Sequence, residues 1–446
     1  MSDPETTVDA QVGSTRRIAL PEGVGSVGIG LVLLGITIYV YLITASHLLG
    51  KKDYAPLGVL WTTVFLVTPG FFNPIEQELS RAIASRRARG DGARPLVRLA
   101  VLASAGMVVA LILVAIALFS ILTSKLFSGK SVVTVVLLFS IVSYSVTFLM
   151  RGVLSGHHRF ATYGWLLGGE GLLRVCGVAV LIAVSSPSAE SLAVLIPFAP
   201  AVVVAVVIWK ERHLLEDGSP ASMPELGRAL GWLLGASVLA QTVLNSPILL
   251  VRLLSASHQT GTVTEYTQAA LLSRVPLFLF QAVQAALLPR LARYYALGDH
   301  NEFVAVLRRL LGAVLALGIA ASVGGWLIGP FVLRVALGGN FELGHRDVGM
   351  LATGGACYLI AIALAQALIA ISQHRAALLG WLVASITLAI TVGLAHDLLW
   401  RCELSAVTSS LAGAAAMGVQ LRRRMHDMGG AVSLDDADVP AVVLAD

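Results

Sequence analysis

Charged side chains inside apolar segments are the residues of this sequence best placed to do chemistry. Glu170 and Arg174 lie four residues apart in one apolar run, and Arg252 and Arg274 lie in two later runs. Charges inside a membrane are costly, so by default they face a bundle interior or a water-filled cavity. The spacing of four places Glu170 and Arg174 on one helical face, within reach of a salt bridge. All four residues are therefore candidates for ligand binding, with purely structural pairing as the alternative.

Amide side chains accompany these arginines in narrow stripes. On a helix with about 100° per residue, Gln241 and Asn245 fall within about 40° of Arg252. A second stripe consists of Arg274, Gln281 and Gln284. The planar guanidinium group forms paired hydrogen bonds to phosphoryl oxygens and loses water more readily than an ammonium group. The pattern predicts a site for a phosphate or pyrophosphate group.

Prolines interrupt the same polar segments. Pro247 and Pro276 each remove a backbone donor, so we expect local bends in the runs that carry the stripes. Such bends would let a central cavity open and close, or would only shape static packing. A further dense patch, Asn73-Pro74-Ile75-Glu76-Gln77-Glu78-Leu79-Ser80-Arg81, is predicted to kink at its proline. Glu76, Glu78 and Arg81 then form a cytoplasmic gate or a simple ion pair at the membrane interface.

The composition predicts what positions these residues. Of 446 residues, 57% are hydrophobic and 13% charged, and the mean hydropathy is +0.83, which indicates an integral membrane protein. Apolar runs of about 20 residues suit helices that cross a membrane, and shorter alternating strands of a barrel are not seen. The twelve predicted runs are 24–47, 56–79, 96–121, 131–154, 161–184, 190–209, 226–253, 264–289, 303–329, 346–372, 376–397 and 402–421.

Clusters of positive charge predict the orientation. Arginines precede the first run, crowd the loop after the second run and follow the last run. The positive-inside rule then places both termini, 1–23 and 422–446, in the cytoplasm, with the last segment disordered. The net charge of +5 follows from this topology, and we predict no binding of nucleic acid. The excess of arginine over lysine and the wealth of Ala, Gly and Val are typical of a GC-rich bacterium.

One short phrase occurs twice. The residues HHRFATYGW at 157–165 are echoed by QHRAALLGW at 373–381, each between an even-numbered run and the next. An offset of six runs predicts two parallel six-helix lobes, 24–209 and 226–421, joined by a cytoplasmic linker at 210–225. Parallel repeats are a transporter architecture with a site between the lobes near the midplane. Trp165 and Trp381 are expected in the interfacial aromatic belt.

The intramembrane charges do not repeat. At the same offset, Glu170 and Arg174 correspond to Ile386 and Ile390. The fold therefore does not require these charges, which favours a functional role for them.

Features of an enzyme or a metalloprotein are missing from the sequence pattern. Cys176, Cys357 and Cys402 are far apart and outside any metal-binding motif, so neither a metal nor another cofactor is predicted. His345-Arg346-Asp347 is the nearest approach to a catalytic cluster and is better explained as a solvated loop. We therefore expect a protein that is not an enzyme.

Two stretches carry a resemblance to a known family. NPIEQELSRAIA at 73–84 and RGVLSGHHRFATYGWLLGGEGLLR at 151–174 resemble the polysaccharide flippases of the multidrug/oligosaccharidyl-lipid/polysaccharide exporter superfamily. The resemblance implies that a polyprenyl-(pyro)phosphate-linked saccharide moves from the cytoplasmic to the outer leaflet of the bacterial plasma membrane. It further implies alternating access, with membrane lipids and glycan polymerases or ligases as partners in cell-envelope polysaccharide assembly.

In this interpretation, Arg174, Arg252 and Arg274 hold the pyrophosphate, and Glu170 positions Arg174 or carries a coupling ion. The membrane potential, Na⁺ and H⁺ are all open as energy sources. One alternative is a cation-coupled multidrug or metabolite antiporter that uses Glu76, Glu78 and Glu170. Another is a scaffold in polysaccharide assembly that transports nothing.

Overall fold

A computed structural model describes most of the chain. It covers residues 24–184, 187–227, 229–256, 259–278, 299–338, 341–395 and 397–435, together with positions 280, 291, 294, 295 and 297. Side chains are described as far as Met425. Every extended regular element in these ranges is helical.

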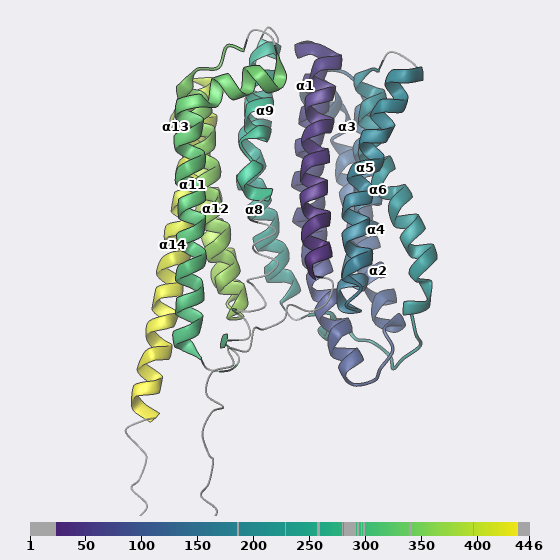
Figure 1. Ribbon diagram of the computed structural model, residues 1–446, viewed down its shortest axis with the longest axis vertical. Helices are drawn as coiled ribbons and strands as arrows, with labels where there is room; N and C mark the ends of the chain where they lie inside the picture. Colours follow the sequence, from purple (N-terminus) through teal and green to yellow (C-terminus); the bar gives the residue numbers. More distant parts are fainter. Residues whose placement is uncertain are drawn as a thin grey trace, which may run out of the picture.

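The helices form two side-by-side groups (Figure 1). The first group contains α1 (Val24–Ala88), α2 (Arg94–Ala117), α3 (Phe119–Ile121), the π-helical turn η1 (Leu122–Leu126), α4 (Ser131–Gly156), α5 (Phe160–Val184) and α6 (Ala189–Glu211). The short helices η2 (Arg212–Leu214) and α7 (Met223–Gly227) lie between the groups in the sequence. The second group contains α8 (Leu230–Leu254), α9 (Thr260–Leu272), α11 (His300–Leu337), α12 (His345–Ala370), α13 (His374–Leu394) and α14 (Leu398–Asp435).

α1 contains two of the predicted runs. Its helical geometry is interrupted at Gly50, where φ is 65° and ψ is 179°, a conformation that glycine adopts without steric cost. Ser26 near its start packs on Gly164, and Glu76 near its end accepts a hydrogen bond from neighbouring Tyr163. Because both ends of α1 meet the same turn of α5, the chain reverses direction at Gly50.

The predicted fold class is confirmed. Ten of the described helices are long and apolar enough to cross a membrane. α1 counts once among them although it holds two runs, and the run predicted at 264–289 is described only in part, as α9 and the residues just after it. The chain is an all-helical, multi-pass membrane protein with two lobes.

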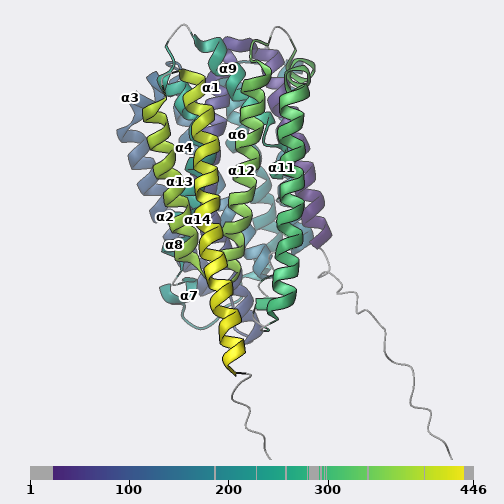
Figure 2. The ribbon, with the colours of Figure 1, turned by 90° about the vertical axis from the view of Figure 1, so that its left-hand side faces the viewer.

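The two lobes share one core and also have cores of their own. Tyr41, Ile248 and Tyr266 belong to a buried cluster that draws on both lobes. A separate cluster around Tyr358, Trp381 and Met417 fills the second lobe, where α11, α12, α13 and α14 pack side by side (Figure 2). Many large apolar side chains point outward instead, as expected where lipid replaces water. Packing within each lobe therefore coexists with a firm contact between lobes.

The repeated phrase forms two similar turns that are displaced by two residues. His158 and Ser372 both have left-handed backbone angles, with φ of 56° and 59°. The amide of His158 donates to Ser155 O, and that of Ser372 donates to Ile369 O in the same pattern. His158 thus lies in the turn, whereas its sequence counterpart His374 lies in the first turn of α13.

Because of this displacement, the two tryptophans differ in exposure. Trp165 is 73% exposed, as expected for the interfacial belt, but Trp381 is 2% exposed. Its ring lies 5.4 Å from that of Tyr358 in the core of the second lobe. The prediction that Trp381 belongs to the interfacial belt is therefore wrong.

Arg86 anchors the segment between the lobes. Its side chain is 1% exposed, and it pairs with both oxygens of Glu225, Nε to Oε1 at 2.6 Å and Nη2 to Oε2 at 2.8 Å. It also donates to the carbonyls of Ser219, Pro220 and Gly92. Ser219 in turn donates hydrogen bonds from its hydroxyl and amide to Asp91. These bonds hold the pKa of Asp91 below its usual value.

Replacing Arg86 tests this anchor. Arg86→Ala should lower the free energy of unfolding by about 1.5–3 kcal/mol, because it removes charge-assisted hydrogen bonds to a partly exposed carboxylate and to loop carbonyls. Arg89→Ala is the matched control. Arg89 also approaches Glu225, at 3.6 Å, but its side chain is 59% exposed, so its loss should cost less than about 1 kcal/mol. The free energy of unfolding is measured by equilibrium unfolding of the detergent-solubilised variants. An equal decrease for Arg86→Ala and Arg89→Ala would contradict the anchoring role.

Candidate functional site

A break in a membrane helix places Arg274 inside the bundle. α9 ends at Leu272, Ser273 follows as its cap, and helical structure resumes at Val275 just before Pro276. The amide of Arg274 donates to Leu271 O at 3.2 Å. Irregular backbone at membrane depth is tolerated only where protein buries it or it lines a cavity, and discontinuous helices build the sites of many transporters. The break therefore marks Arg274 as a candidate site residue.

Neutral groups hold the Arg274 side chain. Its Nη1 donates to Asn245 Oδ1 at 2.9 Å, and its Nη2 donates to Leu244 O at 2.8 Å. Asn245 is fully buried and is oriented by bonds from its Nδ2 to the backbone and side-chain oxygens of Gln241. Three of the predicted site residues, Gln241, Asn245 and Arg274, thus come together.

No carboxylate neutralises Arg274 within the part of the chain that the structure describes. The sequence from 279 to 297, which continues directly from this helix, also contains no acidic residue. An arginine in an apolar bundle normally pairs with an anion. Among the described residues, the charge of Arg274 therefore has only dipolar compensation.

The cavity beside Arg274 lies among helices of the second lobe. A cavity of about 40 Å³ is bounded by Arg274, Ser273, Gly354, Tyr358 and Ser410, among others. Gly354 is nine residues into α12, so its depth is about 14 Å at 1.5 Å per residue, near the middle of an apolar core about 30 Å thick. The present volume suits water, since ligand pockets typically measure about 300–1,000 Å³. A larger ligand would need the site to open.

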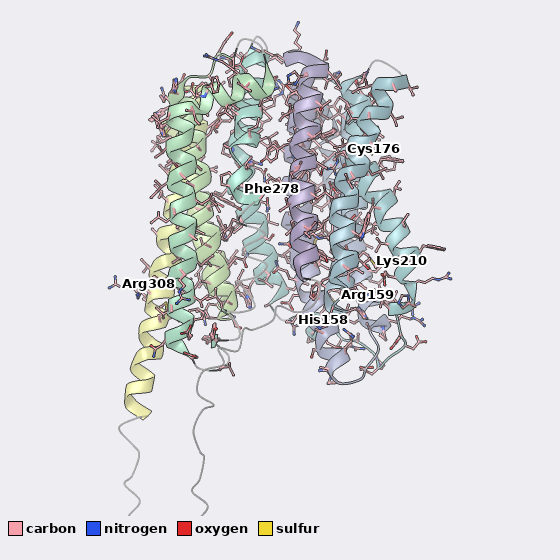
Figure 3. All side chains as sticks on the ribbon, viewed as in Figure 1. His158, Arg159, Cys176, Lys210, Phe278 and Arg308 are labelled. Carbon is pink, nitrogen blue, oxygen red and sulfur yellow. The ribbon has the colours of Figure 1, made fainter. Side chains whose placement is uncertain are left out.

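One aromatic residue of the first lobe, Tyr39, packs beside this site. Tyr39 of α1 donates to Leu271 O at 3.2 Å and packs edge-on against Phe278, with 5.8 Å between ring centroids. Figure 3 shows Phe278 in the space between the two groups of helices. Movement of α1 relative to the second lobe would therefore change access to Arg274.

Arg174 lies in a separate site inside the first lobe. It forms a salt bridge with Glu170, Nη2 to Oε1 at 2.5 Å, and Tyr144 donates to the same carboxylate oxygen at 2.7 Å. The guanidinium carbon is 5.2 Å from the ring centroid of Trp61 and 5.9 Å from that of Tyr41. Because Arg174 is 0% exposed and already neutralised, it cannot contact a ligand in this conformation.

Arg252 lies in a third place. Its Nε donates to Leu126 O at 3.1 Å and its Nη2 to Ser128 Oγ at 2.8 Å, so it ties α8 to the first lobe. The expectation that Arg174, Arg252 and Arg274 converge on one ligand is wrong for this conformation, because their partners do not overlap. Amphipathic spacing had aligned Arg252 with Asn245, but the long side chain extends toward η1 instead.

More contacts seal the lobes near Arg252. Glu265 of α9 forms a salt bridge with Lys51 at the reversal of α1. Gln268 donates to Ser46 Oγ at 2.6 Å, and Thr264 donates to the carbonyl of Lys51. We call this region the Lys51 end of the bundle, and the opposite region, with Arg86, the Arg86 end.

The predicted gate residues separate into two pairs. Glu76 accepts from Tyr163 at 2.7 Å and lies 3.2 Å from Arg151 Nε. Glu78 pairs with Arg81 at 2.8 Å, which is the simple ion pair that their spacing also allowed. Arg81 reaches the linker, with its Nη2 3.3 Å from the carbonyl oxygen of Glu225.

The prolines differ in their effect on the helices. α1 keeps helical angles through Pro74, and its only non-helical residue is Gly50. α8 is continuous through Pro247, whereas Pro276 follows the break at Ser273 and Arg274. Gln281 and Gln284 lie outside the described residues.

Sequence patterns missed several members of these sites. The tyrosines Tyr39, Tyr144, Tyr163 and Tyr358 give no periodic signal, since each has an apolar ring that suits a membrane helix. Glu403 is also new: it is fully buried, with Arg346 3.7 Å away. His345, Arg346 and Asp347 form the first turn of α12 and not a loop, but His345 and Arg346 are exposed, as expected of a solvated segment.

Comparison with known sequences gives distant relatives. No protein-family model matches the chain. Uncharacterized proteins of Mycobacterium bovis and Mycobacterium tuberculosis are 25% identical over 422 residues, which span 90% of this chain and 92% of each relative. The similarity runs through essentially the whole bundle.

Comparison with solved structures identifies the fold. An inward-facing multidrug resistance MATE family transporter of the MOP superfamily has a TM-score of 0.67 and 13% identity, covering 89% of this chain and 96% of its own. A mutant of the Vibrio cholerae MATE transporter VcmN has a TM-score of 0.66 and 13% identity, covering 91% and 97%. A MOP superfamily transporter from Pyrococcus furiosus has a TM-score of 0.66 and 12% identity, covering 91% and 96%. The chain has the fold of these proteins, which are transporters rather than enzymes.

The structural role of the Glu170–Arg174 pair can be tested with a double-mutant cycle. Glu170→Met alone should lower the free energy of unfolding by about 3–5 kcal/mol, because it leaves Arg174 buried and unpaired. Glu170→Met with Arg174→Met should recover most of that loss, since an apolar pair of similar volume fits the aromatic surroundings. Equilibrium unfolding in mixed micelles measures both. A double variant as unstable as the single one would show that the pair itself is not what the lobe requires.

Proposed function

We propose that this protein is a membrane transporter that flips a polyprenyl-(pyro)phosphate-linked saccharide between leaflets by alternating access, for cell-envelope polysaccharide assembly. The observation that carries the proposal is Arg274, a cation near the middle of the membrane, at a helix break, held only by neutral acceptors. A half-buried charge in an apolar bundle is costly without a counter-ion. A phosphoryl group entering the site would supply the missing negative charge and accept paired hydrogen bonds.

The charge of the site favours an anionic substrate over an organic cation. Glu170 and Glu76, which an antiporter would need for cations, are already paired with Arg174 and Arg151. The binding pocket of the Pyrococcus furiosus transporter is described as having reverse polarity, which suggests a different function for that protein. The arginine-centred site here supports a similar departure from multidrug export.

The contacts between lobes suggest how access alternates. The Lys51 end is closed by the contacts of Arg252, Glu265 and Gln268 with the first lobe. Entry of a phosphate group to Arg274 therefore requires the lobes to separate toward the Arg86 end, and release requires the contacts at the Lys51 end to break. With both termini cytoplasmic, as the charge distribution predicts, entry takes place from the cytoplasmic leaflet. The membrane potential, Na⁺ or H⁺ would drive the cycle.

Substitution of Arg274 tests the proposal. Arg274→Ala should weaken binding of polyprenyl pyrophosphate by about 10-fold to 100-fold, the value of a charge-assisted hydrogen bond pair of about 1.5–3 kcal/mol, and should abolish flipping. Binding to the detergent-solubilised protein and flipping of a labelled polyprenyl-linked saccharide in proteoliposomes measure the two effects.

Arg252→Ala is the matched control, because it removes a neighbouring intramembrane arginine that is directed away from the Arg274 site. It should bind polyprenyl pyrophosphate as the wild type does, while changing the rate of flipping. An Arg274→Ala variant that is folded and flips the saccharide at the normal rate would refute the proposed role.

A further inference from the structure

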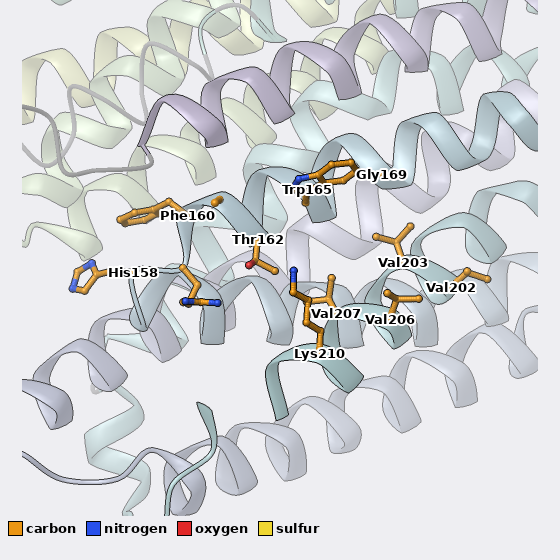
Figure 4. A pocket seen from close by; sticks show the side chains of 12 residues that line it. His158, Phe160, Thr162, Trp165, Gly169, Val202, Val203, Val206, Val207 and Lys210 are labelled. Carbon is orange, nitrogen blue, oxygen red and sulfur yellow. The ribbon is translucent and has the colours of Figure 1, made fainter. Parts of the chain in front are cut away.

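A groove on the outer face of the first lobe lies apart from the Arg274 site. It has a volume of about 790 Å³ and lies between α5 and α6, with Val202, Val203 and Val206 of α6 facing Trp165 and Gly169 of α5 (Figure 4). Gly169 leaves room there, because even a methyl group at that position would touch Val203 at 3.4 Å. The groove is thus large enough for a small ligand and mostly apolar.

The surface around the groove faces lipid. Val206 is 59% exposed, Phe198 is 51% exposed, and Trp165 and Trp209 are 73% and 72% exposed. Exposed tryptophans of membrane helices concentrate at the boundary between headgroups and apolar core. The two tryptophans therefore place this end of the groove at headgroup depth, with the valine wall extending into the acyl-chain region.

Basic residues gather at the headgroup end. His158, Arg159 and Lys210 line the groove there, and Figure 3 shows all three at the same end of the lobe, far from Cys176. Within the described residues, Lys210 forms no salt bridge. Arg159 uses Nη2 to contact Glu211 Oε1 at 3.2 Å and is 46% exposed at its side chain, so its other nitrogens face the groove or solvent.

Sugar-binding groups are scarce in the groove. Its one hydroxyl, on Thr162, already donates to the buried Glu211 at 2.8 Å. The lining thus combines cations at one end with an apolar wall along the rest, which matches a phosphate headgroup followed by acyl chains.

The second lobe provides a natural comparison. Its copy of the repeated phrase places Arg375 over the ring of Trp232, 4.8 Å from the centroid, and Trp381 in the core. The two-residue displacement of the turn thus leaves Trp165 on the surface beside the basic residues of the first lobe, while Trp381 is buried and the exposed Arg375 stacks on Trp232. The lobes differ here although their sequences echo one another.

From these observations we propose that the α5–α6 groove binds an anionic glycerophospholipid of the leaflet at the Arg86 end. The phosphate lies between Lys210, Arg159 and His158, and one acyl chain runs along the valine wall. The site is independent of the transport substrate, because it opens on the outer surface of one lobe rather than between the lobes.

The test compares lipid retention by native mass spectrometry of the full-length protein. The protein is reconstituted in vesicles of equal parts phosphatidylglycerol and phosphatidylcholine, then released in mild detergent. The wild type should retain phosphatidylglycerol about 10-fold over phosphatidylcholine, since each basic residue near a membrane surface adds about 1 kcal/mol of attraction to anionic lipid. Lys210→Gln with His158→Gln should reduce the preference to less than about 2-fold. This variant spares Arg159 and hence the buried Glu211.

Arg375→Gln is the matched control, because it removes a basic residue of the other copy of the phrase, and it should retain the full preference. Val206→Trp should lower retention of both lipids by filling the apolar wall. Thermal unfolding of each variant shows that it is folded. Equal retention of the two lipids by the wild type, or the same loss in Arg375→Gln, would overturn the proposal. So would displacement of phosphatidylglycerol by stoichiometric polyprenyl phosphate, which would identify the groove as an entry route for a lipid-linked substrate.

Discussion

The cost of placing an arginine in an apolar bundle governs the arrangement of this structure. Arg86 and Arg174 are both almost completely buried, and each has a carboxylate within 2.6 Å together with further hydrogen-bonding groups. The carboxylate matches the charge of each, so neither is an unpaired buried cation, although Nε and Nη1 of Arg174 have no hydrogen-bond partner among the described residues. Arg274 is subject to the same cost but has no carboxylate partner among the described residues. Its acceptors are an amide oxygen and a backbone carbonyl oxygen, so the protein alone does not complete its environment, and that incompleteness is what distinguishes a binding residue from a structural one.

The break before Pro276 explains how an uncompensated cation can be held near mid-membrane. A continuous helix would satisfy its own backbone and carry Arg274 outward on a regular face, whereas the break lets α9 end at Leu272 and frees Leu271 O to accept from both Arg274 N and Tyr39. Helix geometry, the arginine and the first lobe are coupled at that point. A shift of α1 against the second lobe would change the helix break, the position of Arg274 and the contact of Tyr39 together. Alternating access requires a coupled movement of this kind.

Asymmetry between the lobes arises from small displacements of a shared pattern. The turns after α4 and α12 have equivalent hydrogen bonds, yet they differ by two residues from the register of the sequence echo. On a helix two residues correspond to a rotation of about 200°, so the same residue types turn to opposite faces. Trp165 consequently faces lipid while Trp381 is buried beside Tyr358. Two lobes that share a short phrase can therefore present different surfaces at that phrase.

The sequence by itself determined the elements of this protein, because the length and apolarity of a membrane helix are local properties. The runs at 24–47 and 56–79, the pairing of Glu170 with Arg174 and the parallel lobes all follow from spacing within or between short segments. Only the tertiary structure decided which polar groups meet. Arg252 shares a helical face with Asn245 but contacts Leu126, and Arg274 finds Asn245 across 29 positions of sequence. Long side chains and helix breaks redirect charges over distances that no periodic pattern records. Which arginines have a carboxylate partner could therefore be decided only from the packed bundle.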